Sequence, residues 1–304
     1  MKKITSLKVT TLADNLVGGG VVLGEWGLSF LLELEDAEGR SHKVISDTGM
    51  TKEAILHNIK KLKLDLSDLE FIFLSHGHLD HTATTVEIIK QVGGGVKVVS
   101  HPYLFLQRFH IDKKGKRTAL GVPEGEGEAE IESVGGEILQ SKEPLEILPG
   151  LWTTGQVPRK MDFEAALPLS PGERLEIVVE GEPIPDQVFD DQALWMDVAN
   201  VGPMVITGCA HSGVINTLLQ VEHLGGFKAI HGLTGGTHLV GRSEEYLQRT
   251  IEEFRKFNIG LLAPCHCTGF KAMARLYQAF PESFALNYCG CVLEAGKEPT
   301  PRVR

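Results

Sequence analysis

The feature that most constrains this sequence is a short apolar run that leads directly into a cluster of histidines. The run Phe71–Leu74 shows no alternation of apolar and polar residues, and His76-Gly77-His78-Leu79-Asp80-His81 follows it. An uninterrupted apolar run of this length predicts a strand that is buried on both faces. The sheet that contains it must therefore be covered on both sides, with chemically active side chains at the end of a buried strand.

The histidine cluster predicts a metal site. Four side chains that can bind a metal ion occur within six positions: His76, His78, Asp80 and His81. In an extended or turning backbone, residues i and i+2 project to the same side, so His76 and His78 can converge on one ion. Asp80 and His81 then turn towards a second position, and Gly77 permits the sharp turn. These ligands suit one or two zinc ions, with manganese or iron as alternatives; a chance cluster on a loop is the competing interpretation.

Composition excludes several classes of protein. The 304 residues are 42% hydrophobic and 23% charged, which is typical of a folded protein with a large core. The net charge is −10, which argues against a dedicated nucleic-acid binder, because phosphate contacts need a basic face. No stretch approaches the roughly 18 apolar residues that cross a bilayer, and residues 4–14 alternate rather than forming a signal, so we expect a cytoplasmic protein. We expect a small anionic molecule as its partner, and a homo-oligomer is left open.

The cysteines argue against a disulfide scaffold. There are five, an odd number, and all lie after residue 208. Reduced thiols are therefore expected. The pairs Cys265-x-Cys267 and Cys289-x-Cys291 leave three interpretations open: a separate zinc or iron–sulfur site, a redox-active pair, and buried free thiols, of which we favour the last.

The order of predicted elements indicates one domain, residues 1–304, built from two sheets. Residues 4–100 give the order strand, strand, strand, helix, strand, helix, strand, and the last third again alternates strands with helices, one of them N-capped by Ser243. Two such halves predict two sheets packed face to face with helices outside. The middle, about 104–190, is predicted to be an inserted irregular segment with a long loop from Pro158 to Pro171. Further strands are predicted at 130–133, 145–148, 151–154, 174–179, 193–198, 204–207, 228–231 and 259–263.

The histidine motif resembles the His-x-His-x-Asp-His element of the metallo-β-lactamase fold superfamily. Supporting elements follow in the order of that family. Asp47 in Ile45-Ser-Asp-Thr-Gly49 resembles its earlier strand-ending Asp, Gly208-Cys-Ala-His211 stands where a metal-bridging residue is expected, and His266 resembles its last histidine ligand. The resemblance implies an α/β (α+β) fold, a four-layer αββα sandwich of two mixed sheets with helices on the outer faces, and one or two metal ions at a sheet edge.

A narrower resemblance is to the dihydropterin-ribofuranosylaminobenzene-phosphate synthase-like subgroup. It is carried by Trp26-Gly-Leu-Ser-Phe30, Thr154-Gly-Gln-Val-Pro-Arg159, Thr207-Gly-Cys-Ala-His-Ser-Gly213, Gly235-Gly-Thr-His-Leu239 and His266-Cys-Thr-Gly269. The sequence departs from the wider pattern at three positions. Gln156 stands near the place of a third-motif histidine, Cys209 replaces the bridging Asp, and Trp26 stands where the subgroup has His. His211 is our candidate to complete the first metal position, and a Cys209 thiolate can also coordinate zinc.

The resemblance implies a ligand set and a reaction. The metal ligands are predicted to be His76, His78, Asp80, His81, Cys209, His211 and His266. We predict a metal-dependent hydrolase that uses a metal-activated water on a small phosphorylated or ester-type substrate. The alternatives are a pterin-related transferase and a non-enzymatic, cysteine-rich metal or redox protein; a nuclease is a weaker third, because of the net charge.

Further residues are assigned roles around this centre. Asp80, His238 and Asp47 are the predicted catalytic residues, with Asp47 expected to orient a histidine rather than to bind the metal. Arg159 and His238 are the predicted substrate-binding residues, since the planar guanidinium of Arg159 suits an anion. The competing interpretations are that His238 is a structural loop residue and that Arg159 is an ordinary surface residue. We interpret the remaining polar-context histidines as solvated surface residues: His42, His57, His110 and His223.

Overall fold

A long sheet that folds over at its middle strand is the basis of the structure. The computed structural model describes residues 2–165, 167, 169–296 and 302–303. The strands follow the order β16-β15-β14-β13-β1-β2-β3-β4-β5-β8. β1 (Ile4–Ala13) pairs along its length with β2 (Ser29–Asp36) but meets β13 (Ala193–Val198) through the single pair Ile4 and Val198. The two halves therefore diverge at β1 and face each other.

The N-terminal half is a layer of strands covered by helices. Its strand β4 shows the predicted burial on both faces: Phe71 and Phe73 enter the core between the halves, whereas Ile72 packs with Ile55 and Ile88 under the helices. The prediction of a doubly buried strand is confirmed. The remaining elements of this half are β3 (Ser41–Ser46), β4 (Leu69–Phe73), β5 (Lys97–Ser100), β8 (Glu137–Gln140), α1 (Lys52–Lys61), α2 (Leu79–Thr82), α3 (Thr85–Val92) and α4 (Glu128–Ser133).

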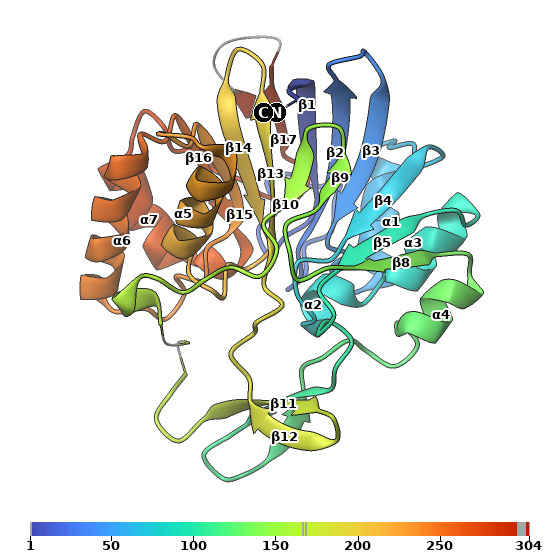
Figure 1. Ribbon diagram of the computed structural model, residues 1–304, viewed down its shortest axis with the longest axis vertical. Coiled ribbons are helices and arrows are strands. Elements are labelled where there is room, and N and C mark those ends of the chain that lie inside the picture. The colour runs from blue at the N-terminus through green and yellow to red at the C-terminus, as the bar shows by residue number, and fades with distance from the viewer. Residues whose placement is uncertain (1, 166, 168, 297–301, 304) are drawn as a thin grey trace.

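The C-terminal half repeats this construction with its own helices. On β14, Met204 and Ile206 face the central core, whereas Val205 packs with Leu218 and Phe254 under the helices. Figure 1 shows helices on both outer sides of the strands, so the predicted αββα sandwich is confirmed. The elements of this half are β14 (Gly202–Thr207), β15 (Gly232–Gly236), β16 (Leu261–Cys265), α5 (Val214–Gly225), α6 (Glu244–Phe257), η2 (His266–Thr268) and α7 (Phe270–Ala279), with β9 (Glu146–Leu148), β10 (Leu151–Thr153), β17 (Val292–Ala295) and β18 (Arg302–Val303) attached at the sides.

Helix α6 illustrates how the sequence sets the ends of an outer helix. The Ser243 hydroxyl accepts a hydrogen bond from the backbone N–H of Tyr246 at 3.2 Å, as predicted for its N-cap. Acidic Glu244 and Glu245 lie in the first turn, where their charges interact favourably with the helix dipole, and left-handed Asn258 ends the helix.

In the described part of the chain, no helix is long and apolar enough to span a membrane.

The segment from 104 to 190 is more regular than expected. It contributes β8, β9 and β10 to the main sheet and forms a separate sheet of β12 (Glu182–Pro185), β11 (Arg174–Val179), β6 (Arg108–Ile111) and β7 (Arg117–Ala119), with η1 (Asp162–Glu164) in the predicted long loop. In Figure 1 this small sheet lies beyond one end of the sandwich. Two predicted strands are wrong: 130–133 belongs to helix α4, and the strand expected at 228–231 lies at 232–236.

Candidate metal centre

Two sets of parallel strands end at the same edge of the molecule. The neighbours β3, β4 and β5 are parallel, as are β14, β15 and β16. Loops at the carboxyl ends of parallel strands are the usual place for a site in an α/β fold. Four residues within three positions of the ends of these strands adopt positive φ, which turns the chain sharply at a conformational cost that functional sites often carry: Asp47, Ala210, His238 and His266.

The loop after β4 carries the predicted histidine motif. His76 is fully buried, and its Nε2 lies 3.1 Å from Nδ1 of His78. A Cβ atom at Gly77 would lie 2.1 Å from the carbonyl oxygen of Leu104, so only glycine fits between the two histidines. The sharp turn predicted at Gly77 is thus set by a close backbone approach.

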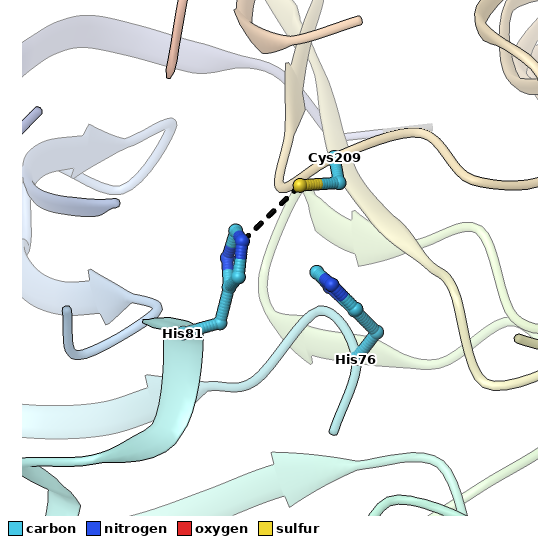
Figure 2. A group of neighbouring side chains, drawn as sticks. All are labelled: His76, His81 and Cys209. Atoms are coloured by element: carbon cyan, nitrogen blue, oxygen red, sulfur yellow. Dashed lines mark hydrogen bonds between the residues drawn. The ribbon is translucent and has the colours of Figure 1, made fainter. Parts of the chain in front are cut away.

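Asp47 holds the far end of this motif. Its carboxylate accepts hydrogen bonds from the Ser75 backbone N–H at 2.7 Å and the Ser75 hydroxyl at 2.8 Å, and its Oδ2 lies 2.7 Å from Nδ1 of His81. This contact directs Nε2 of His81 towards Cys209, whose Sγ lies 3.2 Å away (Figure 2). Asp47 is buried behind His81, in the position of a residue that orients a ligand.

The loop after β14 brings the C-terminal half to the same place. Figure 2 shows Cys209 facing His76 and His81 from the opposite strand system. The ring of His211 lies 4.7 Å, centroid to centroid, from those of both His76 and His78. The structure therefore gathers His211 with the two leading histidines of the motif.

The loop after β16 completes the cluster. Oδ2 of Asp80 lies 3.4 Å from Nε2 of His266 and 3.8 Å from Nε2 of His81. Ligand atoms within 4.8 Å of one another form four overlapping groups: His76, His81 and Cys209; His76, His78 and His211; Asp80, His81 and His266; and Cys209, His266 and Cys267. All seven predicted ligands belong to this cluster, and Cys267 joins it.

Hydrogen bonding shows that these side chains fit a metal. Within the described residues, both ring nitrogens of His211 and of His266, and Nε2 of His78, are buried without a hydrogen-bond partner. Unpartnered polar atoms of this kind are costly in a folded protein and call for an explanation. Imidazole, carboxylate and sulfur donors at mutual ligand distances provide one, because they are the donors that zinc and related divalent cations take.

The electrostatics of the centre separate its histidines into two kinds. Burial lowers the pKa of His76 and of His211 well below the usual range, and it lowers that of His78 to about 4. These imidazoles are neutral near pH 7, which is the form that binds metals. For His81, burial also acts to lower the pKa, but the carboxylates of Asp80 and Asp47 outweigh it and raise the pKa to about 9.

An apolar cavity of about 420 Å³ opens onto the cluster. His78, Asp80, His211 and His266 line one end of it, together with the two sulfurs. The small sheet and the residue after it form part of the cavity wall, because His110 on β6 and Leu120 after β7 both line it. The backbone N–H of Leu79 donates to the carbonyl of Leu120 at 2.9 Å. The remaining walls are apolar: Trp26, Met50, Leu79, Leu120, Leu167, Leu169, Leu175 and Val240. Such a cavity accommodates a small substrate with an apolar part.

The predicted substrate-binding residues lie at different distances from this cavity. His238 lines it, with its ring 4.2 Å from that of His211, and burial lowers its pKa to about 3. Arg159 is not among the described lining residues, and its guanidinium donates to the carbonyl of Gln187. Gln156 is exposed and contacts His101 at 3.3 Å instead of entering the cluster. The roles given to His238 and Arg159 stay predictions.

Sequence reasoning missed four participants. His110, expected on the surface, lines the cavity, and Cys267 joins the ligand cluster. Asp190 accepts a hydrogen bond from the backbone N–H of Gly77 at 2.7 Å and forms an ion pair with buried Arg108 at 2.6 Å. Its neighbour Asp191 accepts a hydrogen bond from the Ser212 N–H at 2.9 Å. One acidic pair thus holds both ligand loops. The only signal in the sequence was two adjacent acids before a predicted strand.

Comparison with known proteins agrees with this geometry. The family model of the metallo-beta-lactamase superfamily matches residues 27–215. The chain belongs to the metallo-beta-lactamase superfamily. A relative in Methanocaldococcus jannaschii, 7,8-dihydropterin-6-methyl-4-(beta-D-ribofuranosyl)-aminobenzene-5'-phosphate synthase, is 28% identical over 96% of this chain and 98% of its own length. A second, the uncharacterized protein MJ0448 of the same organism, is 30% identical over 88% of this chain and 92% of its own.

Solved structures show the same fold. Tm1679, described as a metal-dependent hydrolase of the beta-lactamase superfamily, matches with a TM-score of 0.76 at 24% identity, over 95% of this chain and 99% of that one. The metallo-beta-lactamase fold protein YhfI of Bacillus subtilis matches with a TM-score of 0.53 at 13% identity, over 94% and 98%. At these identities the likeness concerns the fold.

Proposed function

We propose that this chain is a metal-dependent hydrolase that acts on a small anionic substrate with a phosphoryl or ester group and an apolar portion. One observation carries the proposal: buried imidazoles without hydrogen-bond partners converge on the wall of an apolar cavity. Zinc is the cation that we expect there, with manganese or iron as alternatives. A cation bound in such a site lowers the pKa of water and polarises a carbonyl or phosphoryl oxygen.

The chain's own residues then have distinct tasks. His76, His78 and His211 would hold one position, and Asp80, His81, His266 and Cys209 the second. Asp47 fixes the orientation of His81 through its 2.7 Å contact with Nδ1. His238 lies beside His211 on the wall of the cavity, and because burial lowers its pKa to about 3, its neutral ring can donate or accept a hydrogen bond at the substrate. Trp26, half-exposed at 52%, offers a flat face to the apolar portion of the substrate.

A pterin-related transfer reaction is the second candidate. The observation that favours it is the 28% identity to the dihydropterin-linked synthase along 96% of this chain. The product in that relative's name contains a dihydropterin, an aminobenzene ring and a ribose phosphate, so it combines flat ring systems with an anion. The apolar walls of this cavity and its cluster of metal-ligand side chains suit such a molecule equally well.

The two candidates are separated by an activity panel. The zinc- or manganese-loaded protein is offered phosphodiesters, phosphomonoesters, lactones and thioesters singly. It is also offered an aminobenzene ribofuranosyl phosphate together with a dihydropterin whose 6-methyl carbon carries a phosphate leaving group, which the joining reaction would release. Hydrolysis that His78→Ala abolishes, and that His223→Ala on the exposed face of α5 leaves intact, supports the proposal. Formation of a joined product without hydrolysis of the esters supports the transferase. Metal binding with no reaction on any substrate would instead favour the non-enzymatic alternative.

A further inference from the structure

The five cysteines of this chain occupy two kinds of environment. All are free thiols and all are buried. Cys265 packs in the core between the two halves, and Cys289 contacts backbone carbonyls of Leu12 and Leu23. Cys209 and Cys267 instead line the cavity together with His266. Only these two sulfurs, among the described residues, lie within ligand distance of a histidine cluster.

The backbone around Cys267 is arranged for its sulfur to face the centre. Cys267 lies in the single turn η2, so it follows His266 around the turn and both side chains reach the cavity. The backbone N–H of His238 donates to Sγ of Cys267 at 3.3 Å. A Cβ atom at Gly236 would lie 2.6 Å from that sulfur, so glycine leaves the space that the sulfur occupies.

We propose that Cys267 is a second sulfur ligand, which acts with Cys209 and His266 to give the second cation position a preference for thiophilic divalent metals. The ligand atoms of these three residues lie within 4.8 Å of one another, and both ring nitrogens of His266 are buried without a hydrogen-bond partner in the described chain. Two thiolates make the position soft, so zinc, cobalt and cadmium are favoured over magnesium and calcium. This inference rests on the proposed metal-dependent function.

Competing contacts of the Cys267 thiol are weak. Besides the His238 N–H, the thiol contacts the carbonyl oxygen of Cys209 at 3.6 Å, a long contact for a thiol donor. Sγ of Cys209 is 3.2 Å from Nε2 of His81, which is itself in the ligand cluster. Both thiols can therefore lose their protons and bind a cation without breaking a strong hydrogen bond.

The test is a cadmium titration of the reduced, metal-free full chain, followed by the thiolate-to-metal charge-transfer absorption in the near ultraviolet. We expect Cys267→Ser to reduce the band at saturation to about half, Cys209→Ser to do the same, and the double variant to abolish it. Cys265→Ser is the matched control, because Cys265 is two positions away but packs in the core; it should leave the band unchanged. Cys267→Ser should also weaken cadmium binding at least about tenfold.

The failures of the two proposals are distinguishable. If Cys267→Ser binds cadmium with the full band of the unaltered protein, the second sulfur ligand is overturned while the metal centre survives. If the unaltered protein binds no divalent metal, the proposed function itself fails. X-ray absorption of the zinc-loaded unaltered chain gives an answer that no folding defect of a variant can obscure: two sulfurs per protein at about 2.3 Å support the inference, and a single one contradicts it.

Discussion

The two halves of the sandwich supply the same site in different ways. The N-terminal half provides its ligands from one segment, because His76 to His81 lie in one loop and the first turn of α2. The C-terminal half provides them from two separate loops, after β14 and after β16, and the loop after β15 adds the cavity residue His238. Neighbouring strands there are held in fixed register, with Thr207 opposite Gly235 and Gly236 opposite Cys265.

This difference shows what positions each set of ligands. In the N-terminal half, short-range geometry suffices: Gly77 allows the turn, and Asp47 fixes His81. In the C-terminal half, ligands that are distant in sequence meet only because parallel strands end together. Removing a single ligand should therefore lower metal binding and activity equally in both halves. Changes to packing should instead show whether a ligand is held by contacts within its own loop or by the pairing of distant strands.

The largest effect is expected from removing one histidine of each half. His76→Ala and His211→Ala should each lower activity at least about a hundredfold and reduce bound metal, because both rings face the same position. Metal content and turnover are measured on the purified proteins, with His223→Ala as the control. Should His211→Ala retain its metal and its activity, the C-terminal half would have no part in the site.

A pH effect on stability should come from Glu164, which lies in η1 and contacts the start of α5 in the C-terminal half. Burial raises the pKa of Glu164 from 4.5 to about 7, although it accepts backbone N–H bonds from Ile215 and Asn216 at the start of α5. Because the folded state holds this proton more tightly, its contribution is full below about pH 4.5 and is lost as pH rises through about 7. Chemical denaturation between these values should show a loss of about 3 kcal/mol.

The control for this pH effect is Glu164→Gln, which cannot ionise. Its free energy of unfolding should vary less with pH than that of the unaltered chain, by about the same 3 kcal/mol. An identical pH dependence in both proteins would mean that Glu164 ionises normally in the folded state.

Intermediate effects are expected from two glycines, one in each half. Alanine at Gly77 places its Cβ 2.1 Å from the Leu104 carbonyl, and alanine at Gly236 places it 2.3 Å from the Gly208 carbonyl. Each change should destabilise the fold by about 1–3 kcal/mol, measured by denaturation, because backbone atoms cannot easily move aside. Gly19→Ala, with nothing within 4 Å of its Cβ, should be close to neutral. Equal, small effects of all three changes would refute the close-approach argument.

The smallest effect should follow from removing the N-cap of α6. Ser243→Ala loses the 3.2 Å bond to the Tyr246 N–H and should lower thermal stability by about 1 kcal/mol. Activity and metal content should not change, since the Ser243 hydroxyl caps its own helix and belongs to neither the described cavity lining nor the ligand cluster. A loss of metal in this variant would show that helix packing and ligand register are coupled.

The parts of the fold that follow from local patterns could be predicted from sequence. Phe71–Leu74 and the capped helix after Ser243 are examples, because their signals lie within a few residues. Of the small sheet, the sequence predicts β11 but not its neighbours β7 and β12, since β7 is exposed throughout and β12 contains Pro183 and Pro185, which only an edge strand tolerates. Gly232–Gly236 has weak strand propensity, and it forms a strand because β14 and β16 pair with it on both sides.

The candidate site divides in the same way. The spacing of His76, His78, Asp80 and His81 is enough to predict them as metal ligands. The sequence favours a buried free thiol for Cys267, because it does not show that Cys265 packs in the core while Cys267 faces the cavity. Asp190 acts through a backbone N–H far away in the chain, a contact that no local pattern encodes.

The central claim is that both halves of the sandwich contribute ligands to one metal centre. The most direct test is a crystal structure of the zinc-soaked protein with an anomalous map at the zinc edge. We predict a peak within about 2.0–2.3 Å of ligand atoms from both His76 and His211. A zinc peak contacted by residues of one half only would contradict this claim. So would the absence of any peak at the cluster after a soak in excess zinc.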